Sequence, residues 1–179
     1  ALSREAAVLN CFSYTGAFSV YAVRGGAKRV VSVEASATTN EIACLNLVRN
    51  GLSLENHPVR TANVFDYIRE TEEVFDLIIL DPPAFAKSRK DVKQAVRAYK
   101  EINLQAARHI SEGGFLATFS CSNHIDEELF RKIVLGAVLD AGKTAQILSM
   151  AGAGPDHPVS LAHPEGRYLK GLFLSLTDR

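Results

Sequence analysis

Two short segments carry side chains suited to chemistry, Asp81-Pro82-Pro83 and Ser120-Cys121-Ser122. Each directly follows a strongly apolar run, residues 75–80 and 114–119, of the kind found in strands that are buried on both faces of a parallel sheet. In such sheets the functional groups lie just past the carboxyl ends of the strands. We therefore expect the carboxylate and the thiol to face one crevice, where one holds a planar ring and the other attacks it. This pairing indicates an enzyme that acts on a nucleobase.

Polar residues also follow the earlier strands. The segment 10–16, Asn-Cys-Phe-Ser-Tyr-Thr-Gly, joins a strand to a glycine turn and a helix start, which suits a polar ligand. Only Gly16 lies inside the turn, so the G-x-G-x-x-G motif of dinucleotide sites is absent. Glu34, at the tip of the second strand, is placed to bind two ribose hydroxyls. Asp66 is placed to bind an adenine amino group, with Phe65 or Val64 against the ring. A single carboxylate here could equally be a helix cap, but the polar turn, Glu34 and Asp66 at the ends of three successive strands together predict a nucleoside-binding crevice.

Strands and helices that alternate along the whole chain would position these groups. Glycine, proline and hydrophobic periodicity predict strands at 6–12, 29–33, 57–62, 75–81, 114–120, 144–150 and 168–176. Helices are predicted at 16–23, 37–50, 64–71, 91–111 and 126–141, the fourth ended by Gly113-Gly114. This order predicts an α/β fold with a doubly wound, mostly parallel seven-stranded sheet. No helix separates the last two strands, so we expect them to pair antiparallel across the loop 151–167.

Length and composition frame these expectations. The chain has 179 residues, of which 47% are hydrophobic, which suits one globular domain over residues 1–179. With 20 basic and 20 acidic residues its net charge is zero, so overall charge does not indicate a polyanionic partner. Three cysteines without framework spacing suggest a reducing compartment. We find no signal peptide and no membrane-spanning run, and expect a cytoplasmic location. Because the chain enters a strand almost at once, we expect it to be a piece of a longer protein.

Three motifs together resemble a known family. Asn10-x-Phe12-x-Tyr14-Thr15-Gly16, Asp81-Pro82-Pro83-x-Phe85 and Thr118-Phe-Ser-Cys-Ser122 are similar to motifs of class I S-adenosylmethionine-dependent methyltransferases. The resemblance is closest to the bacterial large-subunit ribosomal RNA cytosine-C5 methyltransferases. Segments 156–158 and 164–171 are similar to that family's tail, so the resemblance covers essentially the whole chain. Members carry an RNA-binding domain ahead of the methyltransferase domain, which fits the abrupt start here.

The resemblance implies S-adenosylmethionine as the cofactor and ribosomal RNA as the substrate, with no membrane and no metal. A homodimer is an open alternative to a monomer. The residues that it assigns to the cofactor follow the strand ends: Asn10, Phe12, Tyr14, Gly16, Glu34, Asn63, Phe65, Asp66, Asp81 and Pro82.

Cytosine-C5 methylation needs a nucleophile, because ring carbon 5 is itself unreactive. A thiolate that adds to carbon 6 makes carbon 5 able to attack the sulfonium methyl group, and a base then removes the carbon-5 proton. Cys121 is the expected nucleophile, and Asp81 is expected to bind the amino edge or ring nitrogen of the base. We expect the site to favour thiolate, helped by a helix that begins near Asp126. Larger RNA cytosine-C5 families have a second cysteine beside the two prolines. Because it is missing here, the group that assists product release is open among Lys87, Ser88, His124 and Asp81.

Six cations between residues 87 and 100 follow the first motif directly. Lys87, Arg89 and Lys90, together with Pro83 and Phe85, are the predicted substrate contacts: the prolines form an apolar ledge, Phe85 stacks on the base, and the cations position phosphates. The target base would have to be flipped out of folded RNA. A solvated helix face is the alternative interpretation of the cations. The ligand spacing of a metal site is missing around His157 and His163. We interpret this loop as substrate-side, and plain loop structure is the alternative.

Three alternatives stay open. Cys121 could be a small buried core residue, as Cys11 and Cys44 are expected to be. The Asp-Pro-Pro motif with a following aromatic also serves methylation of a base nitrogen, which needs no cysteine. Finally, the chain could be a cofactor-binding module that has lost activity and docks RNA.

Overall fold

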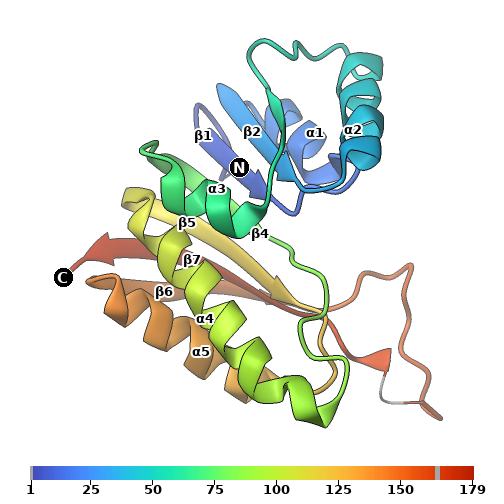
Figure 1. Ribbon diagram of the computed structural model, residues 1–179, viewed down its shortest axis with the longest axis vertical. Coiled ribbons are helices and arrows are strands. Elements are labelled where there is room, and N and C mark those ends of the chain that lie inside the picture. The colour runs from blue at the N-terminus through green and yellow to red at the C-terminus, as the bar shows by residue number, and fades with distance from the viewer. Residues whose placement is uncertain (1, 164–165) are drawn as a thin grey trace.

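Seven strands form one sheet in the order β3-β2-β1-β4-β5-β7-β6 (Figure 1). The computed structural model describes residues 2–163 and 166–179. Pro164 and Glu165 of the predicted tail motif lie outside these residues. The strands are β1 (Ala7–Cys11), β2 (Arg29–Glu34), β3 (Val59–Thr61), β4 (Phe75–Leu80), β5 (Ile110–Ser120), β6 (Lys143–Ala151) and β7 (Lys170–Asp178). The α-helices are α1 (Ala17–Arg24), α2 (Ala37–Arg49), α3 (Val64–Glu70), α4 (Val92–Arg108) and α5 (Glu127–Asp140), with a 3-10 turn η1 (Arg89–Asp91).

The predicted doubly wound sheet is confirmed. β3, β2, β1, β4 and β5 run parallel, while β7 pairs antiparallel with both β5 and β6. The sequence predicted no helix between the last two strands and hence their antiparallel pairing. β6 and β7 do pair antiparallel. As a result, the carboxyl ends of β4 and β5 share one edge of the sheet with the start of β7.

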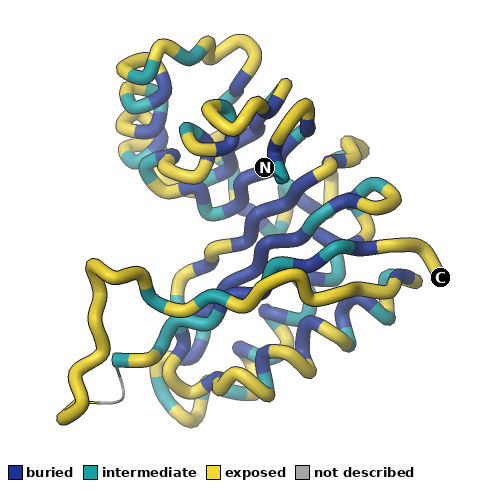
Figure 2. Tube along the Cα trace, turned by 180° about the vertical axis from the view of Figure 1, so that it is seen from behind, coloured by how far each residue is buried: buried dark blue, intermediate teal, exposed yellow. Residues whose placement is uncertain are grey.

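Successive side chains of a strand point to opposite faces of the sheet. Different helices cover these two faces. Leu9 and Cys11 of β1 belong to the larger core cluster, with residues from α3, α4 and α5. Val8 belongs to the second cluster, which includes Ala22 of α1. In Figure 1 the helices α3, α4 and α5 lie in front of the sheet. Seen from behind in Figure 2, the buried central strands contrast with β6, which is exposed along most of its length.

The predicted boundary between the fourth long helix and the fifth strand is wrong. The helix was expected over 91–111 with Gly113-Gly114 as its end, but α4 ends at Arg108 and β5 begins at Ile110. The two glycines lie inside β5, where the β4–β5 register shifts. A Cβ on Gly114 would lie 2.7 Å from Cγ2 of Ile110 and 3.0 Å from the Asp76 carbonyl oxygen. Here the glycines allow a close strand approach at an irregularity and do not end the helix.

Two further expectations about elements need correction. The last strand begins at Lys170, two residues later than expected. The apolar positions Ile42, Leu45 and Val48, whose spacing helped to predict α2, are exposed, whereas Ala43 and Leu47 of the same helix are buried. Among the described residues, none of the helices combines the length and apolar character needed to cross a bilayer.

Candidate active site

Buried hydroxyl groups connect the loops that follow β4 and β5. The Ser120 hydroxyl donates to the Tyr99 oxygen at 3.0 Å, and the Tyr99 oxygen lies 3.0 Å from the Ser122 hydroxyl. The Ser122 hydroxyl also accepts the backbone N–H of Ala86 at 3.2 Å. Tyr99 comes from α4 and is fully buried. This network fixes the Asp-Pro-Pro loop against the Ser-Cys-Ser loop, because buried polar groups that are fully paired rigidify their surroundings.

The structure brings Asp81 and Cys121 together, as their positions after neighbouring strands predicted. The Cys121 thiol donates to the Pro82 carbonyl oxygen at 3.7 Å. Burial and, second, the nearby Asp81 carboxylate raise the pKa of the Cys121 thiol. Asp81 is exposed as a residue, but desolvation by the surrounding protein raises the pKa of its carboxyl group. The carboxylate and the thiol thus influence each other's ionisation at the carboxyl edge of the sheet.

The surroundings of Cys121 differ from the expectation that the site favours thiolate, because they raise the pKa of the thiol. Burial and the nearby Asp81 carboxylate raise the pKa of Cys121, and its sulfur lies 3.7 Å from the Pro82 carbonyl oxygen. The helix expected to assist is α5, which begins at Glu127, and the Asp126 carboxylate caps it by accepting the Leu129 N–H at 2.8 Å. The amides of this helix therefore already have an anionic partner.

The turn after β1 has an unusual backbone. Phe12 and Tyr14 have φ angles of 56° and 47°, in the left-handed region that side chains with a Cβ rarely adopt. Gly16, with φ 82°, completes the turn at the start of α1, and a Cβ there would lie 3.2 Å from the Ala43 Cβ. Glu34 stabilises this turn, because its carboxylate accepts the Tyr14 N–H at 3.3 Å. The predicted cofactor residues Phe12, Tyr14, Gly16 and Glu34 are therefore brought together by the structure.

Asn10 lies differently from its predicted place in the crevice. Its side chain is fully buried on the α1 face of the sheet, where it donates to the Ser19 hydroxyl at 2.9 Å. The Ser19 hydroxyl in turn lies 2.7 Å from that of Ser32 on β2. Asn10 thus joins β1, α1 and β2 through buried hydrogen bonds. Its side-chain amide points toward α1, and its contact with the cofactor stays a prediction.

The predicted adenine side of the crevice begins at α3. Asn63 caps this helix by accepting the N–H groups of Phe65 at 2.9 Å and Asp66 at 3.4 Å. Asp66 is exposed in the first turn, 3.8 Å from Arg69. The sequence analysis gave a helix cap as the alternative role for a carboxylate after a strand. In the structure Asn63 caps the helix, and Asp66 is exposed.

Aromatic rings predicted for two different ligands form one cluster. The Phe12 ring centroid lies 6.2 Å from that of Phe65 and 6.3 Å from that of Phe85. Phe85 also packs against the buried Tyr99 at 4.7 Å. Because the cluster spans the turns after β1, β3 and β4, it couples the expected cofactor side of the crevice to the expected substrate side. Phe85 is partly buried within the cluster.

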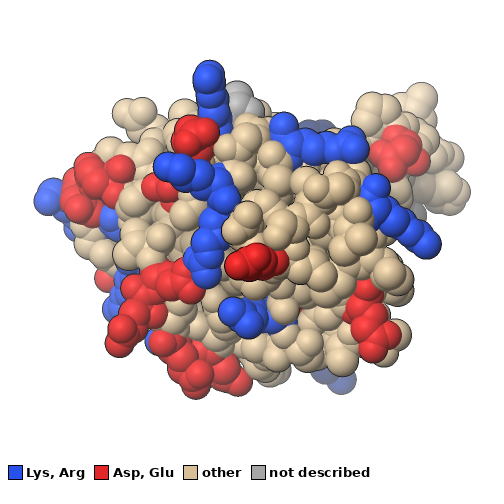
Figure 3. All heavy atoms as spheres, turned by 90° about the horizontal axis from the view of Figure 1, so that it is seen from above, with Lys and Arg blue, Asp and Glu red and all other residues tan. Residues whose placement is uncertain are grey.

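The cations after the Asp-Pro-Pro loop differ in their surroundings. Lys87, Arg89 and Lys90 are exposed, as predicted for phosphate contacts. Lys100 lies 2.7 Å from Asp140 of α5 and is committed to that ion pair. Ser88, a candidate for assisting product release, is bonded through its N–H and its hydroxyl to Asp91. Figure 3 shows basic and acidic side chains interspersed over the face seen from above, which agrees with the zero net charge.

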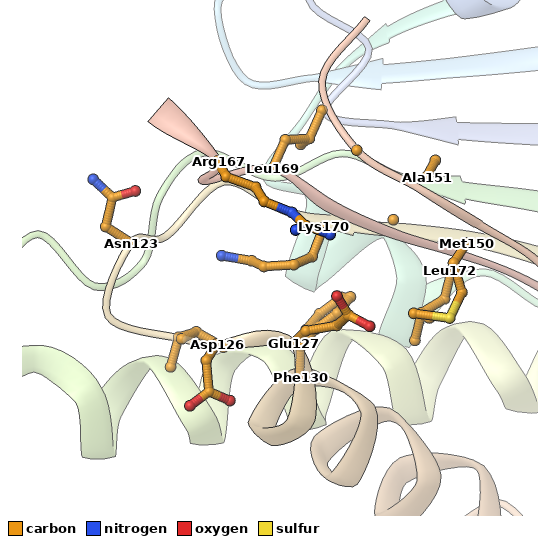
Figure 4. Close-up of a pocket in the computed structure, with 13 residues that line it drawn as sticks. Asn123, Asp126, Glu127, Phe130, Met150, Ala151, Arg167, Leu169, Lys170 and Leu172 are labelled. Carbon is orange, nitrogen blue, oxygen red and sulfur yellow. The ribbon is translucent and has the colours of Figure 1, made fainter. Parts of the chain in front are cut away.

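A cavity of about 430 Å³ lies beside the Cys121 loop, between the start of α5 and the base of the β6–β7 hairpin (Figure 4). Its lining carries both charge signs, with Arg167 and Lys170 among the cations and Asp126 and Glu127 among the anions. Sequence analysis named Lys170 only within a tail motif and did not identify Tyr99 as a residue of the site. Among residues 2–163 and 166–179, no group of three or more His, Cys, Asp and Glu side chains is arranged to hold a metal ion.

Sequence comparison supports this architecture. The family described as "Conserved hypothetical protein 95" matches residues 2–122. The chain belongs to this family. The chain is 49% identical over 168 residues to a protein of Aeromonas salmonicida named "Ribosomal RNA large subunit methyltransferase I", which covers 92% of the chain and 42% of that protein. A protein of Alteromonas mediterranea with the same name is 42% identical over 179 residues, covering 98% of the chain and 45% of that protein. The chain therefore spans less than half the length of these relatives.

Solved structures agree. A methyltransferase complexed with SAH (S-adenosylhomocysteine) is 27% identical, with a TM-score of 0.81, over 97% of this chain and 46% of that one. A SAM-dependent methyltransferase from Streptococcus mutans is 26% identical, with a TM-score of 0.83, over 97% and 45%. The resemblance given by the motifs is confirmed: this is a class I methyltransferase fold of the ribosomal RNA large-subunit methyltransferase I type.

Proposed function

We propose that this chain is the methyltransferase domain of an enzyme that makes 5-methylcytosine in large-subunit ribosomal RNA. S-adenosylmethionine is the methyl donor, in keeping with the SAH-bound structural neighbour. The substrate class follows the names of the relatives. One observation carries the cytosine-C5 assignment: a half-buried thiol lies beside a carboxylate of raised pKa at the carboxyl edge of the sheet.

Addition of the thiol to the base is the first chemical step. The Cys121 proton passes to Asp81, and the sulfur forms a bond to carbon 6 of the cytosine. The electron pair of the carbon 5–carbon 6 bond shifts through the ring toward nitrogen 3, which takes the proton from Asp81. The raised pKa of Asp81 suits this role, because a carboxyl group that readily holds a proton can also donate it to the ring.

Methyl transfer and release follow. Carbon 5 attacks the sulfonium methyl group, a carbon–carbon bond forms, and the methyl–sulfur bond breaks to leave S-adenosylhomocysteine and a cationic ring. A base removes the carbon-5 proton, the carbon 6–sulfur bond breaks, and the nitrogen-3 proton returns through Asp81 to the thiolate. Ser88 is committed to Asp91, so Lys87, His124 and Asp81 are the candidates for that base.

The substrate side of the crevice suits a flipped base. Pro83 is exposed beside Asp81, and the exposed cations Lys87, Arg89 and Lys90 follow within the same loop. An apolar ledge next to a carboxylate accommodates a planar base, and cations at its rim accommodate the flanking phosphates. Because the relatives are more than twice as long as this chain, we expect the rest of the protein to contribute to RNA binding. Action on ribosomal RNA implies a cytoplasmic location.

Methyl transfer to unmodified ribosomal RNA tests the proposal. The full-length protein is incubated with methyl-labelled S-adenosylmethionine, and the digested RNA is analysed for 5-methylcytidine. We expect label in this nucleoside with wild type and with the control Cys44→Ala, and no label with Cys121→Ala. RNA that carries 5-fluorocytosine at the target should trap a covalent complex through Cys121. Label on a base nitrogen that survives Cys121→Ala would instead establish the alternative chemistry, and no transfer at all would leave only a cofactor-binding module.

A further inference from the structure

Lys170 lies where β7 enters the sheet, directly beside the catalytic loop. It pairs with Ser120 in the antiparallel ladder of β5 and β7, one residue before Cys121. The next residue, Gly171, keeps this ladder close, because a Cβ there would lie 2.6 Å from Cε1 of Phe119. The backbone of Lys170 is thus fixed relative to that of Cys121 by strand pairing and by the packing of an aromatic ring.

The Lys170 side chain turns toward the same loop. Its Nζ donates to the Ser122 carbonyl oxygen at 2.6 Å. Figure 4 shows the side chain extending from β7 across the cavity toward the loop that carries Asn123. The ammonium group is half-buried, and no carboxylate of the described residues lies within ion-pair distance of it in the structure. Partial burial of a positive charge without an ion-pair partner costs free energy, which a nearby negative group would offset.

The charged and titratable groups around the Cys121 sulfur come from four elements. Asp81 follows β4, Tyr99 lies on α4, Lys170 lies on β7, and Asp126 precedes α5 and interacts with Lys170. Asp81 disfavours the thiolate, whereas Lys170 favours it. The same sulfur, when ionised, favours the charged form of Lys170, whose pKa is otherwise lowered by burial. Lys170 is therefore the cation through which this site can stabilise a negative sulfur.

We propose that Lys170 is a positioning residue for Cys121, which anchors the loop at the Ser122 carbonyl and places a positive charge beside the sulfur as the thiolate forms. The lysine keeps its own proton throughout, and the thiol proton goes to Asp81. On release of the product, when the carbon 6–sulfur bond breaks, the same charge stabilises the leaving thiolate. This inference rests on the proposed role of Cys121 as nucleophile.

Alkylation of Cys121 measures the effect independently of methyl transfer. The full-length protein is treated with iodoacetamide between pH 6 and pH 10, and the peptide with Cys121 is quantified by mass spectrometry. Lys170→Gln keeps a hydrogen-bond donor but removes the charge, and Lys170→Arg keeps the charge. Lys132→Met is the matched control, because Lys132 is an exposed cation of α5 paired with Glu128. Fully buried Cys11 serves as an internal test of folding, since it should stay unmodified in every variant.

We expect Lys170→Gln to move the reactivity midpoint of Cys121 to higher pH and to slow alkylation at pH 7.5 about five- to tenfold, as the loss of one nearby charge implies. Lys170→Arg and Lys132→Met should behave like wild type. A Lys170→Gln protein that reacts like wild type would overturn the proposal, and so would a Lys170→Arg protein that reacts like Lys170→Gln. If the alkylation shift appears but no 5-methylcytidine forms, the proposed reaction fails while the coupling of Lys170 to Cys121 stands.

Discussion

Cys11 and Cys121 both lie at the carboxyl end of a parallel strand, yet their surroundings differ completely. Cys11 ends β1 and is fully buried among apolar side chains, and burial is what raises its pKa. Cys121 follows β5, is half-buried, and has Asp81, Lys170 and the Pro82 carbonyl around its sulfur. Position at a strand end is thus insufficient for reactivity. A thiol becomes a nucleophile where a proton acceptor, a stabilising cation and a path for the substrate meet.

The largest expected contrast between the two thiols is in methyl transfer. Cys121→Ala should lower 5-methylcytidine formation by about a thousandfold or more, because the covalent route is lost. Cys11→Ala should retain activity within about threefold. Initial rates with full-length protein and unmodified ribosomal RNA measure both. An equal loss of methyl-transfer activity in the two variants would show that the different surroundings of the two thiols do not affect catalysis.

Chemical modification should separate the thiols next. In the native protein, iodoacetamide at pH 8.5 should label Cys121 at least about a hundred times faster than Cys11, whose reaction requires the protein to open. Peptide mapping after short exposures measures the two rates in one sample. Adding denaturant should make the two rates similar, which is the control for intrinsic reactivity. Comparable native rates would contradict the burial of Cys11.

A smaller effect is expected from the hydroxyl network that holds the Cys121 loop. Tyr99→Phe removes the partner of two buried serine hydroxyls, which should lower the free energy of unfolding by about 1–3 kcal/mol. Methyl transfer should fall about tenfold as the loop loosens. Tyr21→Phe is the matched control, because Tyr21 is exposed and should change neither quantity. Urea unfolding and initial rates provide the two measurements, and an unchanged Tyr99→Phe protein would show that the network does not position the loop.

The smallest expected effect is a pH dependence of stability that belongs to Cys11. The unfolded thiol ionises near its ordinary pKa of 9.0, while the folded thiol keeps its proton because burial raises its pKa. The folded state therefore binds more protons above that pH, so the free energy of unfolding falls as pH rises, by up to about 1.4 kcal/mol per pH unit. Urea unfolding from pH 8 to pH 10 should show a shallower decline for Cys11→Ala than for wild type. Parallel curves would contradict this assignment.

Most of the architecture was predictable from local patterns. Apolar runs such as 75–80 and the glycines after helices indicated alternating strands and helices, and the lack of a helix between β6 and β7 indicated their antiparallel pairing. The start of β5 was not predictable in this way. Gly113-Gly114 has the same local signature as a helix end, and only the close approach of β4 and β5 distinguishes the two cases.

The sequence by itself determined that Asp81 and Cys121 follow neighbouring buried strands, which is enough to predict that they meet at one edge of a parallel sheet. It also carried the motifs by which the family was identified. Tertiary structure decided the rest: that Asn10 supports α1 from a buried position, that Tyr99 joins two loops, and that Lys170, 49 positions after Cys121 in the sequence, reaches its loop. Hydrogen bonds and charges between distant segments set the pKa of a side chain, and no local pattern records which segments will become neighbours.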